Sequence, residues 1–237
     1  MVGYNLSMTA PQNAPITISF DGDHGPLLGV FASGDNPRGA LLLVHENRGL
    51  SPHFVDLAGR FAAERYATMC VDLASIEGGS EKIGDEEEIR AVLGRAPRER
   101  LLDDLRASLG ELERRAPGLK LGMIGFCFGG TLTWALLGAG EPRLAAAIAF
   151  YGSTTDGADF SGSKAAVLGI YGGLDEKVNA TRPLAEASLQ AAGLTHQILT
   201  YEGAEHAFFN DTRASHHPGA AAEAQAAVSA WLSEHVG

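Results

Sequence analysis

The sequence Gly125-Phe126-Cys127-Phe128-Gly129 constrains the fold more than any other stretch of this chain. It lies where an apolar run, residues 119–126, gives way to a helix-like run from Phe128 onward. A strand that turns sharply into a helix holds the central side chain clear of its own backbone, and flanking glycines permit that turn. We expect one glycine to adopt a strained dihedral and the other to let neighbouring backbone approach closely. The stretch therefore predicts a presented Cys127 in a position where serine is usual.

The rest of the chain alternates short apolar runs with longer amphipathic stretches, which is typical of βαβ units and a largely parallel sheet. An antiparallel hairpin, residues 16–20 and 27–31, is expected first. Later strands are expected at residues 40–45, 67–72, 119–126, 144–151, 165–171 and 196–201. The clearest helices are expected at residues 54–65, 98–115, 131–137, 182–192 and 219–235. We predict one α/β domain spanning residues 1–237, with residues 1–14 as a loosely ordered N-terminal extension.

Residues 77–100 form the main irregular stretch, with an acidic run at residues 85–88. Arginines follow at positions 95, 98 and 100. Two interpretations stay open for this stretch. It is either a loop and helix near the functional site or a solvated surface helix whose charges face water.

The bulk composition excludes several classes of protein. The net charge of −11 argues against binding to a phosphate backbone, and no run of about 18 apolar residues could span a bilayer. The N-terminus lacks a basic segment followed by an apolar one, the pattern of a secretory signal, so we expect the protein to be located in the cytoplasm. The two cysteines, Cys70 and Cys127, are too few for a disulfide framework, and Cys70 reads as a small buried hydrophobic residue. No metal or cofactor motif occurs, so we expect no cofactor, no metal, a small-molecule substrate and a monomer or homodimer.

A thiol attacks a carbonyl efficiently only as thiolate, so Cys127 needs a histidine to take its proton. Reactive groups in an open α/β sheet gather beyond the carboxyl ends of the strands. Of eight histidines, His206 fits best, because a short turn-forming segment separates it from the strand at residues 196–201. Asp175 follows the preceding strand and could orient that histidine, although it could also cap a helix that begins near Glu176. The order nucleophile, acid, histidine is that of the α/β-hydrolase scaffold.

An acyl-transfer site also needs donors for the oxyanion. The backbone N–H of Phe128 is the first candidate, and that of Asn47, just after the strand at residues 40–45, is the second. Glu46 is open to several interpretations at this point. Its carboxylate could meet the thiol, the substrate or Arg48, or it could form a purely structural ion pair.

Four segments together resemble the dienelactone hydrolases, also called carboxymethylenebutenolidases. They are residues 45–49, residues 125–130, Asp175 and residues 205–208, and the resemblance extends over about residues 16–232. It implies an α/β-hydrolase without a large cap domain and a triad of Cys127, Asp175 and His206. It also implies that Glu46 contacts the resting cysteine and helps to generate the thiolate when substrate enters.

The sequence departs from this family where its dienelactone-cleaving members bind a substrate carboxylate. They carry an arginine four residues after the histidine, and this chain has Asn210 there. Arg48, Arg213 or one of the arginines at 95, 98 and 100 could replace it, because a guanidinium suits a carboxylate bidentately. Several aromatic residues could line an apolar pocket, although some must belong to the core: Phe126, Phe128, Trp134, Tyr151, Tyr171, Phe208 and Phe209.

The sequence thus predicts a cofactor-independent hydrolase of a lactone or small carboxylic ester, which works through an acyl-thioester on Cys127. The alternative is a non-hydrolytic binding or redox-sensing protein that uses a reactive Cys127 on the same fold.

Overall fold

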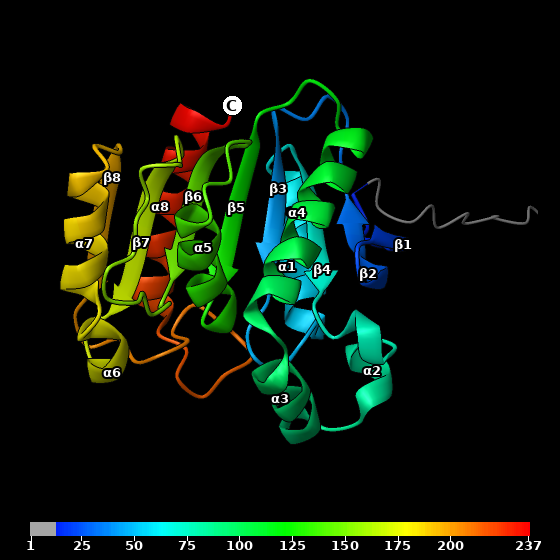
Figure 1. The fold of residues 1–237 in the computed structure, drawn as a ribbon, viewed down its shortest axis with the longest axis horizontal. Coiled ribbons are helices and arrows are strands. Elements are labelled where there is room, and N and C mark those ends of the chain that lie inside the picture. The colour runs from blue at the N-terminus through cyan, green and yellow to red at the C-terminus, as the bar shows by residue number, and fades with distance from the viewer. Residues whose placement is uncertain (1–12) are drawn as a thin grey trace, which may run out of the picture.

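An eight-stranded sheet organises the structure, a computed structural model that describes residues 13–237 (Figure 1). The strand order is β1-β2-β4-β3-β5-β6-β7-β8. Strand β2 runs antiparallel to both β1 and β4, whereas all pairings among β3 to β8 are parallel. The strands are β1 Ile16–Gly22, β2 Gly25–Ala32, β3 Gly39–Val44, β4 Tyr66–Asp72, β5 Leu121–Phe126, β6 Leu144–Phe150, β7 Ala166–Gly172 and β8 His196–Tyr201. The predicted hairpin and the largely parallel sheet of a single α/β domain are confirmed.

Helices cover both faces of the sheet because its central strands are apolar on both sides. Strands β3 to β5 are buried along their whole length, and their side chains alternate between two cores. Leu42 and Val44 pack with α4 and α5, whereas Leu41 and Leu43 pack with α1 and α8. The covering helices are α1 Pro52–Ala63, α4 Arg98–Arg115, α5 Phe128–Gly138, α7 Arg182–Ala191 and α8 Pro218–His235 (Figure 1).

Helix α5 begins at Phe128, directly after Cys127, as the helix-like run from that residue indicates, and it extends beyond both ends of the range 131–137. The glycines at 129 and 130 lower helix propensity in its first turn. These glycines allow α5 to pack closely against backbone, because a Cβ on Gly129 or Gly130 would lie within 2.4 Å of a carbonyl oxygen.

The buried thiol of Cys70 behaves as the sequence indicates. Cys70 lies in β4 and is fully buried. Burial, together with the charge of Asp72, raises the pKa of this thiol well above its usual range. It is therefore an inert core residue.

The irregular stretch at residues 77–100 folds into short helices that follow β4 and lie outside the sheet. It contains α2 Ser80–Ile83 and α3 Glu86–Arg95, preceded by a 3-10 turn, Ser75–Glu77. Asp72, at the end of β4, accepts hydrogen bonds from the N–H and the hydroxyl of Ser80 at 2.6 and 2.7 Å. The same hydroxyl accepts from the N–H of Leu50 at 3.0 Å. These contacts fix the base of the segment to β4 and to the loop after β3.

Residues 1–12 of the predicted N-terminal extension lie outside the described residues. Within residues 13–237 no helix is both long enough and apolar enough to cross a membrane.

The anchoring role of Asp72 predicts a clear loss of stability in Asp72→Asn. The NH2 group of the asparagine would replace one acceptor oxygen, so either the N–H or the hydroxyl of Ser80 would lose its partner. We therefore expect the free energy of unfolding to fall by about 1–3 kcal/mol. Urea denaturation measures this change. The control is Asp156→Asn, an exposed position, which should stay within about 0.5 kcal/mol of the parent chain. Equal effects at the two positions would contradict the anchoring role.

Candidate active site

Cys127 occupies a strained turn between β5 and α5. Its φ and ψ are 54° and −109°, a region that residues with a side chain rarely adopt. Its N–H donates to the carbonyl of Phe150 at 3.0 Å, and its carbonyl accepts from the N–H of Thr131 at 2.9 Å. The strained dihedral therefore belongs to Cys127 itself. The expectation that a flanking glycine would adopt it was wrong, because the turn is centred on the cysteine.

The glycines around Cys127 serve close approach instead. A Cβ on Gly125 would lie 2.1 Å from the carbonyl oxygen of Gly129, and a Cβ on Gly129 would lie 2.2 Å from that of Val44. A Cβ on Gly152, a residue that the sequence analysis missed, would lie 2.3 Å from the carbonyl carbon of Gly130. The first turn of α5 is thus pressed against β3 and against the loop after β6.

The structure brings the predicted histidine and carboxylate together. Nδ1 of His206, on the loop after β8, lies 2.5 Å from Oδ2 of Asp175, on the loop after β7. The Asp175 side chain is 8% exposed and that of His206 is 40% exposed. Asp175 also caps the short helix α6 Glu176–Asn179, because its Oδ1 accepts from the N–H of Val178 at 3.4 Å. The two sequence interpretations of Asp175 therefore hold at once, one on each oxygen.

The protonation of His206 reflects both Asp175 and Cys127. Burial alone would lower the pKa of His206. Its hydrogen bonds to Asp175 and Cys127, with the charges on those two groups, outweigh burial and raise this pKa from 6.5 to about 10. With Nδ1 directed at Asp175, the ring has Nε2 free for Cys127. The arrangement favours an imidazolium beside a sulfur.

Two further strained residues lie beside this group. Tyr151, after β6, has a φ of 37°, and Ala207, next to His206, has a φ of 61°. The centroids of the Tyr151 and His206 rings are 5.1 Å apart. The Tyr151 hydroxyl is buried without a hydrogen-bond partner within residues 13–237. Its burial, followed by the charges of Glu46 and Cys127, raises its pKa well above the usual range.

Glu46 is almost completely buried at the end of β3. Its Oε2 accepts from Arg213 at 3.1 Å and from the Asn210 amide at 3.3 Å. Its Oε1 has no partner among the residues that the structure describes. The neighbouring His45, whose pKa burial lowers, donates from Nδ1 to the carbonyl of Glu46 at 2.7 Å and accepts at Nε2 from Leu73 at 3.1 Å. His45 thus fixes the backbone of Glu46, a role that the sequence analysis did not assign.

The oxyanion candidates lie on adjacent strand ends. Phe128 is the first residue of α5, so its N–H is one of the unpaired donors at the helix N-terminus. Asn47 follows β3, which pairs with β5 from Ala40–Leu121 to Val44–Gly125. Its N–H makes no hydrogen bond to any residue between 13 and 237. Both donors therefore lie at the same edge of the sheet as Cys127.

The candidate arginines separate into two sets. Arg48 and Arg213 both contact Glu86, at the start of α3. By contrast, Arg95 pairs with Glu77 at 3.2 Å and Arg100 pairs with Asp104 at 2.6 Å, away from Glu46. Arg98 begins α4. Only the first set is connected to the groups around Cys127.

Most of the proposed pocket aromatics belong to the core. Phe126, Trp134 and Phe208 are at most 2% exposed, so the structure places them in the core rather than at an accessible surface. Phe126 stacks on Phe150 at 4.8 Å, and the Trp134 indole donates to the carbonyl of Gly152 at 3.1 Å on the α5 face. Tyr171 is equally buried. Aromatic residues at strand ends satisfy the packing of the cores first.

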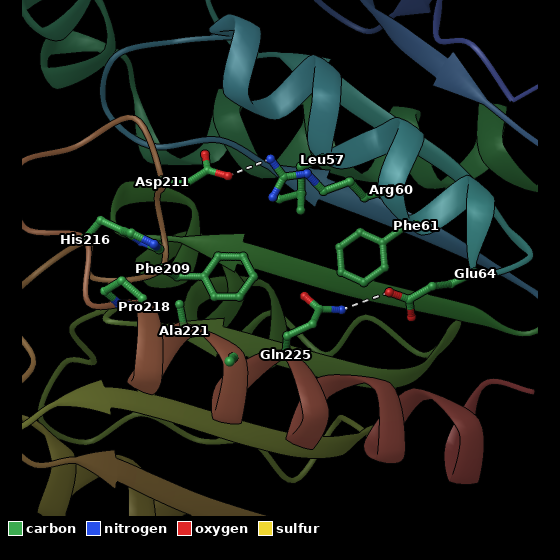
Figure 2. A pocket seen from close by; sticks show the side chains of 11 residues that line it. Leu57, Arg60, Phe61, Glu64, Phe209, Asp211, His216, Pro218, Ala221 and Gln225 are labelled. Carbon is green, nitrogen blue, oxygen red and sulfur yellow. Dashed lines mark hydrogen bonds and ion pairs between the residues drawn. The ribbon is translucent and has the colours of Figure 1, made fainter. Parts of the chain in front are cut away.

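Phe209 lines a different cavity. Figure 2 shows its ring facing Phe61 across a space of about 360 Å³ between α1 and α8. Arg60 and Asp211 are paired at 2.6 Å at one end of this space, and Glu64 and Gln225 at 3.0 Å at the other. None of the lining residues is Cys127, Asp175 or His206.

Asn210 is also unsuited to direct contact with substrate. It is 1% exposed, its amide donates to Glu46, and its Oδ1 accepts from the N–H and hydroxyl of Thr212 at 3.0 and 2.7 Å. It positions Glu46. For metals, residues 13–237 contain no cluster of three or more histidine, cysteine or acidic side chains that could hold an ion.

Comparison with known proteins finds one family over most of the sequence. The model of the dienelactone hydrolase family matches residues 27–236. An Escherichia coli protein named "Putative carboxymethylenebutenolidase" is 30% identical over 217 residues, which cover 86% of this chain and 79% of the relative.

Solved structures are similar over nearly the whole chain. A "Putative Dienelactone Hydrolase" from Klebsiella pneumoniae superposes with a TM-score of 0.80 at 27% identity, covering 94% of this chain and 100% of that one. The dienelactone hydrolase from Anabaena variabilis has a TM-score of 0.73 at 20% identity, covering 96% and 100%. The latter likeness concerns the fold alone.

The close approach at the elbow predicts that Gly125→Ala is strongly destabilising. The new Cβ would meet backbone, which cannot rotate away, so we expect a loss of about 3 kcal/mol in the free energy of unfolding. The control is Gly94→Ala in α3, where nothing lies within 4 Å of the added Cβ. That change should stabilise the chain by about 0.5–1 kcal/mol. Urea denaturation compares the two, and a neutral Gly125→Ala would refute the tight elbow.

The raised pKa of His206 predicts a pH-dependent stability. Because the folded pKa, about 10, exceeds the ordinary 6.5, the protonated histidine stabilises the folded state fully below pH 6.5. That contribution is lost as pH rises from 6.5 to about 10. We expect the free energy of unfolding to fall more steeply over this window in the parent chain than in His206→Gln. Identical pH profiles for the two chains would show that His206 carries no such coupling.

Proposed function

This chain belongs to the dienelactone hydrolase family of carboxylic ester hydrolases, and we propose that it cleaves a lactone or small ester through Cys127, His206 and Asp175. The observation that carries the proposal is the hydrogen bond between His206 Nδ1 and Asp175 Oδ2 at 2.5 Å, together with the influence of Cys127 on the pKa of the same ring. A base that is oriented by a carboxylate and contacts a thiol is the arrangement that nucleophilic catalysis requires.

The proposed reaction has two halves. His206 accepts the Cys127 proton, and the thiolate forms a bond to the carbonyl carbon of the substrate. The resulting oxyanion accepts hydrogen bonds from the N–H groups of Phe128 and Asn47, each worth about a hundredfold or more in rate. The carbon–oxygen bond then breaks, and His206 gives its proton to the leaving alkoxide, which leaves an acyl-thioester. Water, deprotonated by His206, attacks the thioester, and the acid departs as Cys127 is regenerated.

A role for Glu46 in forming the thiolate is part of the proposal. It is supported by the buried, unpartnered Oε1 of Glu46 and by the joint influence of Glu46 and Cys127 on Tyr151. A buried carboxylate oxygen without a donor favours any proton that it can reach. The family resemblance implies that the resting Cys127 thiol contacts Glu46, which would help to generate the thiolate when His206 accepts the thiol proton. We also propose a cytoplasmic location, and a monomer or homodimer that needs no cofactor.

The proposal predicts that Cys127→Ala loses ester hydrolysis. We expect kcat/KM for 4-nitrophenyl acetate and for a simple neutral lactone to fall about a thousandfold or more, because removing one member of a catalytic triad removes most of its effect. The matched control is Cys70→Ala, which deletes the other thiol from the core and should keep kcat/KM of the folded fraction within about twofold.

The same enzyme preparation separates the two function hypotheses. Iodoacetamide should label Cys127 and abolish turnover in parallel, while Cys70 stays unlabelled because it is fully buried. Full hydrolysis by Cys127→Ala would contradict the mechanism. A reactive Cys127 in a parent chain that turns over no ester or lactone would instead favour the redox-sensing alternative.

A further inference from the structure

Two guanidinium groups meet at a single carboxylate beside the proposed active site. Arg48 donates from Nη1 to Oε2 of Glu86, and Arg213 donates from Nη1 to Oε1 at 3.5 Å. The two arginines come from distant parts of the chain, the loop after β3 and the loop after β8. One arginine on each oxygen is how proteins commonly hold a carboxylate. Here the protein supplies that carboxylate itself.

The charges in this network balance. Arg213 also donates from Nη2 to Glu46 at 3.1 Å, so two arginines face two glutamates. Arg213 is only 17% exposed, and its pairings are therefore screened less than those of a surface ion pair. A carboxylate on a substrate would find neither arginine available and would face the charge of Glu86 as well.

The position of Glu86 is set by the backbone. It is the first residue of α3, and the preceding Asp85 caps that helix by accepting from the N–H groups of Glu87 and Glu88 at 2.9 and 3.0 Å. Ile89, one turn further on, is buried in the core. The Glu86 side chain thus starts from a fixed point next to both arginines, although it is 56% exposed itself.

The Arg48–Glu86 end of the network borders a cavity beside residues 77–100. This cavity has a volume of about 1070 Å³, and its wall includes Arg48 and Glu86 together with Leu50, Val55 and Ile89, but not Cys127, His206 or Asp175. The size suits a small-molecule ligand. The two arginines are already neutralised by Glu86 and Glu46 and offer a substrate carboxylate no free counter-ion, so desolvating such a carboxylate beside them is costly.

We propose that Glu86 is a specificity-determining residue that reserves the site for uncharged esters and lactones. It does so by holding Arg48 and Arg213 in place of a substrate carboxylate. This inference rests on the proposed function, because it names the substrate class of the same site.

The test compares an anionic ester with an uncharged one in which a methyl group masks the carboxylate. Mono-4-nitrophenyl succinate carries a free carboxylate, and its methyl ester does not. We expect the parent chain to have the higher kcat/KM on the methyl ester. In Glu86→Gln, the ratio of the two kcat/KM values should shift about tenfold toward the acid, since hydrogen bonds to charged groups are worth about that much. The shift should come from faster turnover of the acid.

The control is Glu87→Gln, which removes the same charge from the next residue of α3 and should leave the ratio unchanged. A ratio is insensitive to a partly unfolded sample, since both substrates report on the same active fraction. A parent chain that prefers the acid, or a Glu86→Gln ratio equal to that of the parent, would overturn the inference alone, provided that Cys127→Ala is inactive on both esters. If Cys127→Ala still hydrolysed both, the proposed function would fail and this inference with it.

Discussion

The reactive end of this protein depends on one close approach of backbone to backbone. The first turn of α5 lies so near β3 and the loop after β6 that no Cβ fits at Gly125, Gly129 or Gly152. Cys127 must then pass from strand to helix within one residue, and it adopts a positive φ to do so. A strain of about 1–3 kcal/mol persists only where surrounding packing over-determines it. The completely buried strands β3 and β5 on either side supply that packing.

Burial then decides which charges around Cys127 need a partner. Asp175 and Glu46 are both nearly inaccessible, and an unpaired buried carboxylate is costly. Asp175 meets His206, and Glu46 meets Arg213 and the Asn210 amide. This explains how asparagine can stand where some family members carry arginine. The amide supplies a hydrogen bond at that position, and Arg213, whose N–H donates to the Asn210 carbonyl at 3.1 Å, supplies the positive charge.

The sequence predicts the sheet and the positions of its reactive ends, because both follow from local patterns. Apolar runs mark the strands, and residues just beyond them, such as Asp175 and His206, share one edge. What it could not predict is which way an aromatic side chain points. Phe126 directly precedes Cys127 and Phe208 follows His206 by two residues, yet both are buried in the core. For Phe126, the last residue of β5, the alternation of side chains along a strand decides which face it meets, so nearness to Cys127 in sequence does not indicate exposure.

The role proposed for Glu86 was beyond sequence reasoning for a different reason. Its acidic run looks like a solvated helix face, and Glu87 and Glu88 fit that description, but Glu86 meets arginines 38 and 127 positions away. Such a pairing follows from tertiary structure alone, through the anchoring of α2 by Asp72 and Leu50. The sheet and its loops thus carry the proposed chemistry, whereas a helical segment outside the sheet carries Glu86, the residue proposed to hold Arg48 and Arg213. A change confined to that segment could alter which esters are accepted without disturbing the strained turn at Cys127.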